Sequence, residues 1–267
     1  MIVVSPSTSN AAVIKAARKY DKSKITQESI LVSKKEIESA KKEVDLDFKK
    51  SAKEVHRRIK NFSEKSLRDD WYMRTNHGGY IGEKFIPFDR VGAYIPGGSA
   101  PLVSTALMTV TLAKVAGVKE IVACSPANKN GTLNPYVIYA LHYSGATEIY
   151  KIGGVQAIGV MAFGTQSIKK VRKIVGPGGP YVTAAKRQVY GNVSLDMIAG
   201  PSEIGILCDR AADPAYIAAD LLSQAEHGTG LEKSLLVTTS DEHAKSIRNE
   251  LIKQSKFLNR QEMIQKV

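Results

Sequence analysis

The residues best suited to chemistry in this sequence are a glutamine and a histidine three positions apart, Gln224 and His227. Asp213 followed by Pro214 is typical of a helix start, so a helix is predicted from about Pro214, and residues three apart on it share a face. A neutral imidazole binds metal ions, and a glutamine carbonyl can add an oxygen ligand. The pair could equally be an ordinary helix end, with His227 favoured by the helix dipole and Gly228 ending the helix. Because two such ligands are a poor zinc signal, both interpretations stay open.

Three glycine-rich turns are the second feature that could bind a ligand. Each follows an apolar run and precedes a predicted helix: Pro96-Gly97-Gly98-Ser99, Gly153-Gly154-Val155-Gln156 and Gly176-Pro177-Gly178-Gly179. At the carboxyl ends of parallel strands, such glycines let backbone amides approach a pyrophosphate at a helix N-terminus. Tyr94 and Gln156 lie at two of the turns and would add an aromatic surface and an amide. No turn matches Gly-x-Gly-x-x-Gly, so ordinary βα turns remain the alternative.

The elements that must position these residues follow from the hydrophobic pattern. From Val91 onward, short apolar runs alternate with helical segments, which predicts a parallel α/β sheet. Strands are predicted at 91–95, 120–124, 148–152, 173–175, 204–208 and 234–238. Helices are predicted up to Ala116, at 135–144, up to Phe163, at 181–190, from about 214 and at 241–254. His243 is expected in the exposed first turn of the last of these helices.

Within the first 90 residues, the segment from Ser33 to Phe62 is predicted to be helical. Ser33 with Glu36 forms a capping box, and apolar residues then recur every three or four positions as far as Phe62. This pattern predicts an amphipathic α-hairpin or kinked helix. Residues 71–90 are predicted to be an irregular connection with a tight turn at Thr75-Asn76-His77-Gly78-Gly79, because Asn and Gly tolerate positive φ angles.

Composition limits the class of protein. The chain has 267 residues, 43% hydrophobic and 24% charged, which suits one or two folded domains. The net charge of +12 comes from basic residues interspersed with acids, without a basic tract interleaved with aromatics, so nucleic-acid binding is disfavoured. No apolar run approaches the ~20 residues of a membrane span and no signal core is recognised, so a cytoplasmic protein is expected. Cys124 and Cys208 each lie in an apolar run and are expected to be buried, reduced thiols.

Several of these motifs together strongly resemble the histidinol dehydrogenase family, in order and spacing, from about residue 20 onward. The motifs are Val91-Gly92-Ala93-Tyr94-Ile95-Pro96-Gly97-Gly98, Gly153-Gly154-Val155-Gln156-Ala157-Ile158, Gly176-Pro177-Gly178, Ala184-Ala185-Lys186-Arg187, Ala199-Gly200-Pro201-Ser202-Glu203 and Leu221-Leu222-Ser223-Gln224-Ala225-Glu226-His227. Six such motifs in one order are far more specific than any one of them.

The resemblance implies a zinc- and NAD-dependent homodimer that oxidises L-histidinol to L-histidine through the aldehyde. It implies that Tyr94 and Gln156 contact NAD and that Ser202 contacts the substrate. Gln224 and His227 would supply two zinc ligands that also border the substrate. The implied fold is two incomplete Rossmann-like parallel βα domains with an N-terminal helical segment. We expect residues 91–202 to form one domain, inserted into a discontinuous domain of residues 1–90 and 203–267.

The chain departs from the family pattern at three places. Gly179 stands where the family has an NAD-contacting asparagine, and Gly-Thr-Gly-Leu-Glu-Lys-Ser follows His227 in place of Gly-Pro-Asp-Ser. The family's Glu-His general-base pair, and the aspartate and histidine that complete its zinc shell, are not among these residues. The expectation is therefore a truncated enzyme whose catalytic residues are unknown, which on its own binds zinc weakly and turns over little or nothing.

Other functions remain open at this stage. A family member could oxidise another polar alcohol, such as a sulfonated propanediol, which would suit the basic charge. A non-catalytic remnant could serve as a binding or oligomerisation module. A nucleic-acid binder is the third alternative, and it would show salt-dependent retention on DNA.

Overall fold

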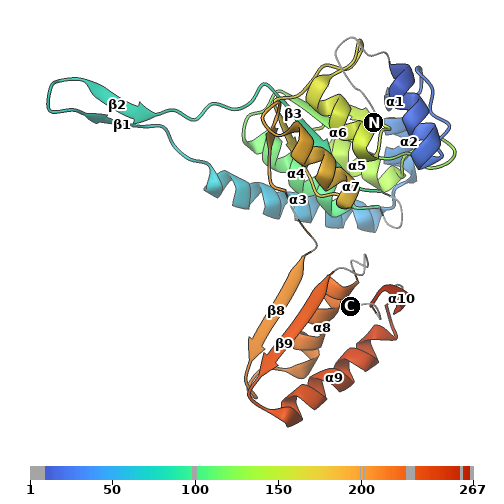
Figure 1. The fold of residues 1–267 in the computed structure, drawn as a ribbon, viewed down its shortest axis with the longest axis vertical. Coiled ribbons are helices and arrows are strands. Elements are labelled where there is room, and N and C mark those ends of the chain that lie inside the picture. The colour runs from blue at the N-terminus through green and yellow to red at the C-terminus, as the bar shows by residue number, and fades with distance from the viewer. Residues whose placement is uncertain are drawn as a thin grey trace. The chain divides into compact units, whose positions relative to one another are not determined.

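The computed structural model describes residues 10–97, 101–198, 200, 202–226, 232–258 and 261–264. The chain divides into two compact units, Met1–Ile198 (unit 1) and Ala199–Val267 (unit 2), which are treated separately below (Figure 1). Unit 1 contains, in chain order, α1 (Asn10–Ala16), the π-helix η1 (Ala17–Asp21), α2 (Lys34–Glu43), α3 (Leu46–Ser66), β1 (Trp71–Arg74), β2 (Tyr80–Glu83), β3 (Arg90–Tyr94), α4 (Val103–Val115), β4 (Glu120–Cys124), α5 (Pro135–Ser144), β5 (Glu148–Tyr150), α6 (Gly154–Phe163), β6 (Lys173–Val175), α7 (Pro180–Val189) and β7 (Ser194–Leu195). Unit 2 contains β8 (Glu203–Cys208), α8 (Pro214–Ala225), β9 (Lys233–Thr238), α9 (Asp241–Ser255) and α10 (Gln261–Ile264).

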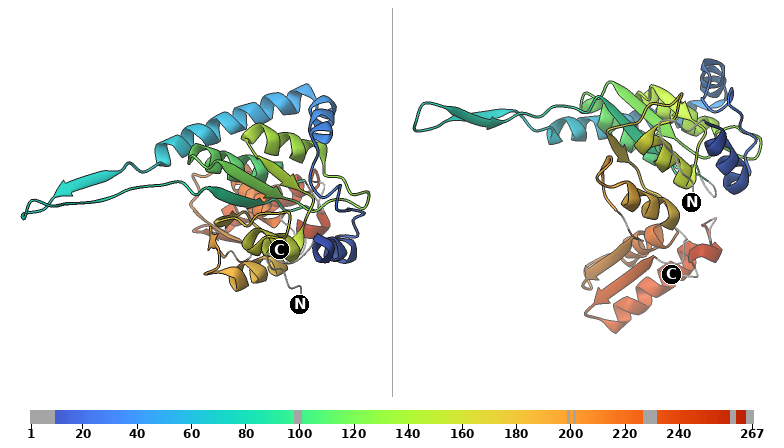
Figure 2. Two further views of the ribbon diagram at one scale, coloured as in Figure 1. Left: turned by 90° about the horizontal axis from the view of Figure 1, so that it is seen from above. Right: turned by 45° about the horizontal axis from the view of Figure 1, so that its top comes forward.

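The centre of unit 1 is a five-stranded sheet in the order β5-β4-β3-β6-β7, with every neighbouring pair parallel. The chain moves outward from β3 to β5 and then returns to the other side of β3. With right-handed crossovers this reversal places α4 and α5 on one face and α6 and α7 on the other, and Figure 2 shows helices on both faces of the sheet. Both faces of β3 are buried along its whole length, as in a doubly wound parallel sheet. The predicted α/β class is confirmed.

A buried arginine joins three strands at the amino edge of this sheet. Arg90, at the start of β3, is 6% exposed, and its guanidinium donates to Glu120 (2.6 Å) and to Glu148 (2.5 and 2.9 Å), which begin β4 and β5. Burying this charge is tolerable because both carboxylates neutralise it. Ion pairs thus link the starts of β3, β4 and β5 at the amino edge of the sheet. A ligand site is therefore expected among the loops at the carboxyl edge.

The N-terminal helices pack on the same core as the sheet. Val13, Ala40 and Ala52 belong to one cluster of buried side chains with Val91 and Ile121. The segment predicted to be an α-hairpin or a kinked helix consists of two helices, because the first helix ends at Val44 and Asp45 caps a new one. Residues 1–90 and 203–267 were predicted to form one discontinuous domain. That domain would combine parts of both units, so it stays a prediction.

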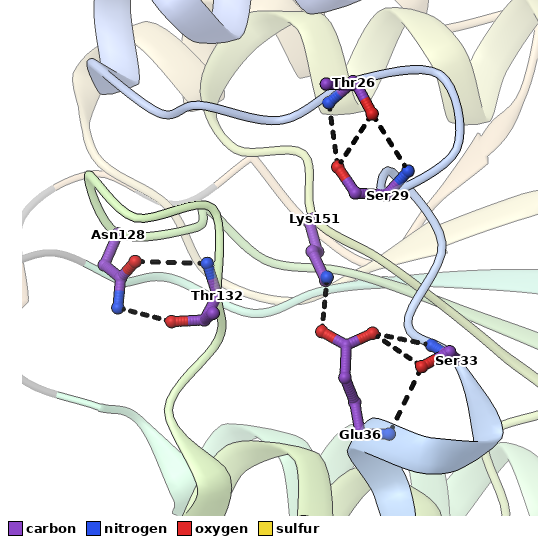
Figure 3. Close-up of polar contacts among 7 residues, drawn as sticks. All are labelled: Thr26, Ser29, Ser33, Glu36, Asn128, Thr132 and Lys151. Atoms are coloured by element: carbon purple, nitrogen blue, oxygen red, sulfur yellow. Dashed lines mark hydrogen bonds and ion pairs between the residues drawn. The ribbon is translucent and has the colours of Figure 1, made fainter.

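The capping box at Ser33 is confirmed, and it continues into a buried ion pair. The Ser33 backbone N–H donates to Glu36 Oε2 (2.9 Å), and the Glu36 backbone N–H donates to Ser33 Oγ (3.2 Å). The other carboxylate oxygen of Glu36 pairs with Lys151, which is 3% exposed and directly follows β5 (Figure 3). The start of α2 is therefore fixed to the carboxyl end of β5.

Residues 71–90 are not simply irregular, as predicted, because they contain an antiparallel hairpin of β1 and β2. The predicted turn is correct: Gly78 has φ +83° and the Gly79 backbone N–H donates to Thr75 Oγ1. The strands were missed because every residue of both strands is exposed, so no alternating buried face marks them. Figure 1 shows the hairpin projecting from the sheet and helices of its own unit.

Unit 2 is built around one parallel βαβ crossover, and β8 pairs with β9 along six residues. Asp213 caps α8 as predicted, since its carboxylate accepts from the Ala215 backbone N–H (2.8 Å). One face of the two strands packs with α8 and α9 around Ile217, Leu221 and Ile247. The opposite face, called here the open face, carries the exposed side chains Leu207 (80%), Leu235 (60%) and Val237 (50%).

The prediction that His243 is exposed is wrong, because its side chain is only 8% exposed. His243 lies one helical turn before Ile247, which is fully buried, and residues four apart share a helix face.

Cys124 is fully buried and unpaired, as predicted, and burial raises the pKa of its thiol to about 12. Cys208 is also unpaired but only half-buried.

Candidate functional site at the carboxyl edge of the sheet

The loops that follow β3, β4, β5 and β6 meet at the carboxyl edge, and glycine is required at the contacts. A Cβ on Gly153 would lie 2.3 Å from the Pro126 side chain, and one on Gly97 would lie 2.7 Å from it. Gly176 has φ +113°, and a Cβ there would lie 2.1 Å from the backbone oxygen of Tyr94. The glycines therefore allow loops to touch one another. This packing role accounts for much of the glycine pattern without a ligand.

The two residues predicted to contact a cofactor come together at the first turn of α6. The backbone N–H of Gly154 donates to the Tyr94 hydroxyl (3.1 Å), and the Gln156 side-chain nitrogen donates to Asp21 Oδ2 (2.9 Å). Tyr94 is 5% exposed and Gln156 2%, and burial raises the pKa of Tyr94. Among the described residues, the Gln156 carbonyl oxygen receives no hydrogen bond. This oxygen is therefore an acceptor without a protein partner in the described part of the chain.

Asp21 belongs to this site and was missed in the sequence. It comes from η1, 135 positions before Gln156 in the chain, and burial raises the pKa of its carboxyl group. No local pattern marks it, since neither spacing nor hydrophobic periodicity connects residues so far apart. Only the fold brings the two side chains together.

A cavity of about 830 Å³ opens beside Asp21, a size that suits a small-molecule or cofactor site. Its walls come from η1 and from the loops after β3 and β4, including Tyr20, Asp21, Pro96, Gly97, Ser125 and Pro126. The wall formed by the β4–α5 loop is held in shape because Asn128 and Thr132 exchange side-chain and backbone hydrogen bonds (Figure 3).

In the third glycine turn, Gly176 is held by hydrogen bonds, whereas Gly179 at its other end has open space around it. The Gly176 backbone N–H donates to Asp196 (2.8 Å), and the buried Lys186 donates to the Gly176 carbonyl (3.1 Å) while pairing with Asp196. Gly179 is the N-cap of α7, no side chain caps that helix, and a Cβ on Gly179 would meet open space. An uncapped helix start favours an anionic group, so these residues fit the phosphates of a dinucleotide.

The predicted metal and substrate residues lie in unit 2. Ser202 is exposed just before β8, and Gln224 is half-buried in the last turn of α8. The Gln224 side-chain nitrogen is buried and has no partner among the described residues, whereas His227 lies outside them. No group of three or more His, Cys, Asp or Glu side chains in the described part of the chain could hold a metal. The described residues alone therefore do not form a zinc centre, and the predicted pair stays a prediction.

The strand order of unit 1 defines the class of protein. In this parallel sheet, successive strands are added on one side of β3 up to β5 and on its other side from β6 onward, which is the strand order of Rossmann-like folds. Such folds bind ligands at the carboxyl ends of the strands, at the point where the order reverses. Tyr94 and Gly176 flank that point, and their loops are in contact. The structure is therefore a Rossmann-like α/β protein with a crevice at the expected edge.

The chain belongs to the histidinol dehydrogenase family, whose sequence model matches residues 6–267. It is 44% identical to the histidinol dehydrogenase of Bacteroides fragilis over 248 residues, 92% of this chain and 57% of the relative. It is 42% identical to that of Carboxydothermus hydrogenoformans over 260 residues, 97% of this chain and 61% of the relative. The crystal structure of histidinol dehydrogenase from Elizabethkingia anophelis superposes with a TM-score of 0.90 at 38% identity, covering 96% of this chain and 58% of the other.

These comparisons confirm the resemblance read from the motifs. They also show that the chain spans about 57–61% of the length of the relatives it matches. A search of the helices in the described residues finds none with the length and apolar character that a membrane crossing requires.

Proposed function

We propose that this chain forms the cofactor-binding part, and a portion of the metal and substrate site, of a cytoplasmic zinc- and NAD-dependent enzyme. The reaction would be the oxidation of L-histidinol to L-histidine through the aldehyde. The observation that carries this proposal is the meeting of Tyr94 and Gln156 at the start of α6, beside the point where the strand order reverses. Membership of the histidinol dehydrogenase family supports the choice of alcohol.

The roles of the residues follow from their chemistry. NAD, when bound, accepts the hydride, and the protein supplies its binding and orientation. The free carbonyl of Gln156 and the hydroxyl of Tyr94 would hold the cofactor, and the open start of α7 would favour its phosphates. Ser202 would hold the alcohol, and Gln224 with His227 would bind both alcohol and zinc. The catalytic base is not assigned to any of these residues.

Gly179→Asn is expected to tighten NADH binding by about 2- to 10-fold, because one added hydrogen bond contributes about 0.5–1.5 kcal/mol. A side chain fits at this position, since a Cβ would meet nothing within 4 Å and the backbone φ is −67°. NADH fluorescence titration of the purified chain, without alcohol, measures the effect. The matched control is Gly205→Asn in β8 of unit 2, an exposed position where a side chain also meets nothing within 4 Å and the backbone is not left-handed.

Gly205→Asn should leave the NADH dissociation constant unchanged. Equal tightening by both variants would contradict the placement of the cofactor at the start of α7. A wild-type chain that does not bind NADH at all would contradict the proposed function.

We also propose that the protein is a homodimer whose contact includes the hairpin. Tyr72, Tyr80 and Ile81 are 64%, 72% and 54% exposed, and an isolated two-stranded hairpin with such side chains is stabilised by a partner surface. Sedimentation equilibrium is expected to show a dimer, weakened by Tyr80→Ser with Ile81→Thr. The control variant, Lys84→Ser, should leave the dimer intact. A monomeric wild-type chain would contradict this part of the proposal.

A further inference from the structure

Asp21 is presented by an unusual stretch of backbone. It ends the π-helix η1, and the next residue, Lys22, has a left-handed backbone with φ +53°, the only described non-glycine residue with positive φ. π-Helical turns are rare and frequently occur at functional sites, and left-handed non-glycine residues cost free energy that the surroundings must offset. Both features place the Asp21 carboxylate where a regular helix would not.

The carboxylate is held at the first turn of α6 by the Gln156 side chain. It accepts from the Gln156 side-chain nitrogen at 2.9 Å. The backbone N–H of Gly154 is taken by the Tyr94 hydroxyl. The first backbone N–H of α6 is therefore satisfied by a protein group.

The bond to Asp21 determines which way the Gln156 amide points. A carboxylate only accepts hydrogen bonds, so the nitrogen of the amide must face Asp21 and the carbonyl oxygen must face away from it. Without the carboxylate, the amide could turn by half a rotation and present its nitrogen in place of its oxygen. The donor or acceptor character of Gln156 toward a ligand would then be undefined.

The segment that carries Asp21 is anchored at both ends. Before η1, the Asn10 side chain donates to Ser167 (2.7 Å) and accepts from Thr165 (2.7 Å), just beyond the end of α6. After η1, Glu36 pairs with Lys151 at the end of β5 (Figure 3). These anchors do not involve Gln156, so they can be changed separately from the Asp21 contact.

We propose that Asp21 is a positioning residue of the cofactor site, which fixes the Gln156 side chain so that its carbonyl oxygen faces the nicotinamide dinucleotide as an acceptor. This inference rests on the proposed function, in which Gln156 contacts NAD. Asp21 acts through Gln156 in this proposal, although it also lines the neighbouring cavity.

The test is a double-mutant cycle on the full 267-residue chain, read by NADH fluorescence titration without alcohol and by NMR of the Gln156 side-chain amide. Asp21→Ala and Gln156→Ala should each weaken NADH binding by about 3- to 10-fold, as expected for one hydrogen bond. Because Asp21 acts through Gln156, the double variant should be no weaker than Gln156→Ala alone, within about twofold. Asp21→Asn, which keeps one acceptor oxygen, should be intermediate.

The NMR signal separates this inference from the proposed function. In the wild-type chain the Gln156 amide protons should exchange slowly with solvent, and in Asp21→Ala they should exchange fast, whether or not NADH binds. Asn10→Ala is the matched control, since it loosens the same segment at its other anchor. It should lower the melting temperature and leave both the Gln156 signal and the NADH dissociation constant unchanged.

Two results would overturn the inference. One is an unchanged Gln156 amide signal in Asp21→Ala. The other is additive loss of NADH affinity in the double variant, which would mean that Asp21 contacts the ligand directly. A wild-type chain that fails to bind NADH, with the NMR change present, would refute the proposed cofactor role and leave Asp21 as a structural partner of Gln156.

Discussion

A fusion of this chain to the part of the Bacteroides fragilis relative that follows the matched stretch is expected to oxidise L-histidinol at least about 10²-fold faster than the 267-residue chain alone. The chain covers 57% of that relative. Under the proposed function, the general-base pair and two further zinc ligands would come from the fused part. A positioned general base is typically worth about 10²- to 10⁴-fold in rate. NADH formation followed by absorbance, with added zinc, measures the difference.

Variants of the fusion test the metal residues. Gln224→Ala and His227→Ala should each lower zinc affinity and NADH formation at least about tenfold, since even the outer partners of metal ligands contribute this much. His77→Ala, an exposed histidine in the hairpin turn, should change neither quantity. A sulfonated propanediol serves as the second substrate. Activity on that alcohol alone would replace histidinol, and a folded but inactive fusion would favour the non-catalytic module.

Gly176→Ala is expected to be the most destabilising of the glycine substitutions in the crevice, by about 2–6 kcal/mol. The φ of +113° is strained for any L side chain, at a cost of about 1–3 kcal/mol. The new Cβ would also lie 2.1 Å from the backbone oxygen of Tyr94, so the β3 and β6 loops would have to separate, with a further overpacking cost of about 1–3 kcal/mol. Urea unfolding followed by circular dichroism measures the change.

Gly179→Ala is the matched control for this substitution. It lies in the same turn, has an ordinary φ of −67° and meets no atom within 4 Å, so its effect should stay within about 0.5 kcal/mol. If the two variants unfold at similar urea concentrations, close contact between the loops does not determine the stability of this edge.

Local patterns in the sequence predicted the parts of the fold that depend on neighbouring residues. The strands at 120–124 and 173–175, the capping box at Ser33 and the cap at Asp213 depend on propensity, periodicity and turn chemistry over a few positions. The site was predicted in part. Tyr94 and Gln156 were found through glycine turns and family motifs, and the structure brings them to one helix end.

The features that were missed depend on contacts that no local pattern encodes. Asp21 reaches Gln156 across 135 positions, so the interaction exists only after the N-terminal segment has packed on the sheet. His243 was placed on the wrong face because its helix has polar residues around a narrow apolar stripe, and the position of Ile247 decides which way that stripe points. The hairpin strands were missed because neither face is buried within this chain.

The open face of unit 2 is expected to govern how the purified chain behaves in concentrated solution. Leu207, Leu235 and Val237 are exposed branched aliphatic side chains on the β8–β9 sheet, whose outer edges pair with no further strand in the described residues. Surfaces of this kind adhere to one another, and strand edges template further strands. Aggregation of the stored protein should therefore begin at the β8–β9 sheet, while unit 1 is still folded. Shielding these three side chains with a detergent micelle or with polar replacements is the direct remedy.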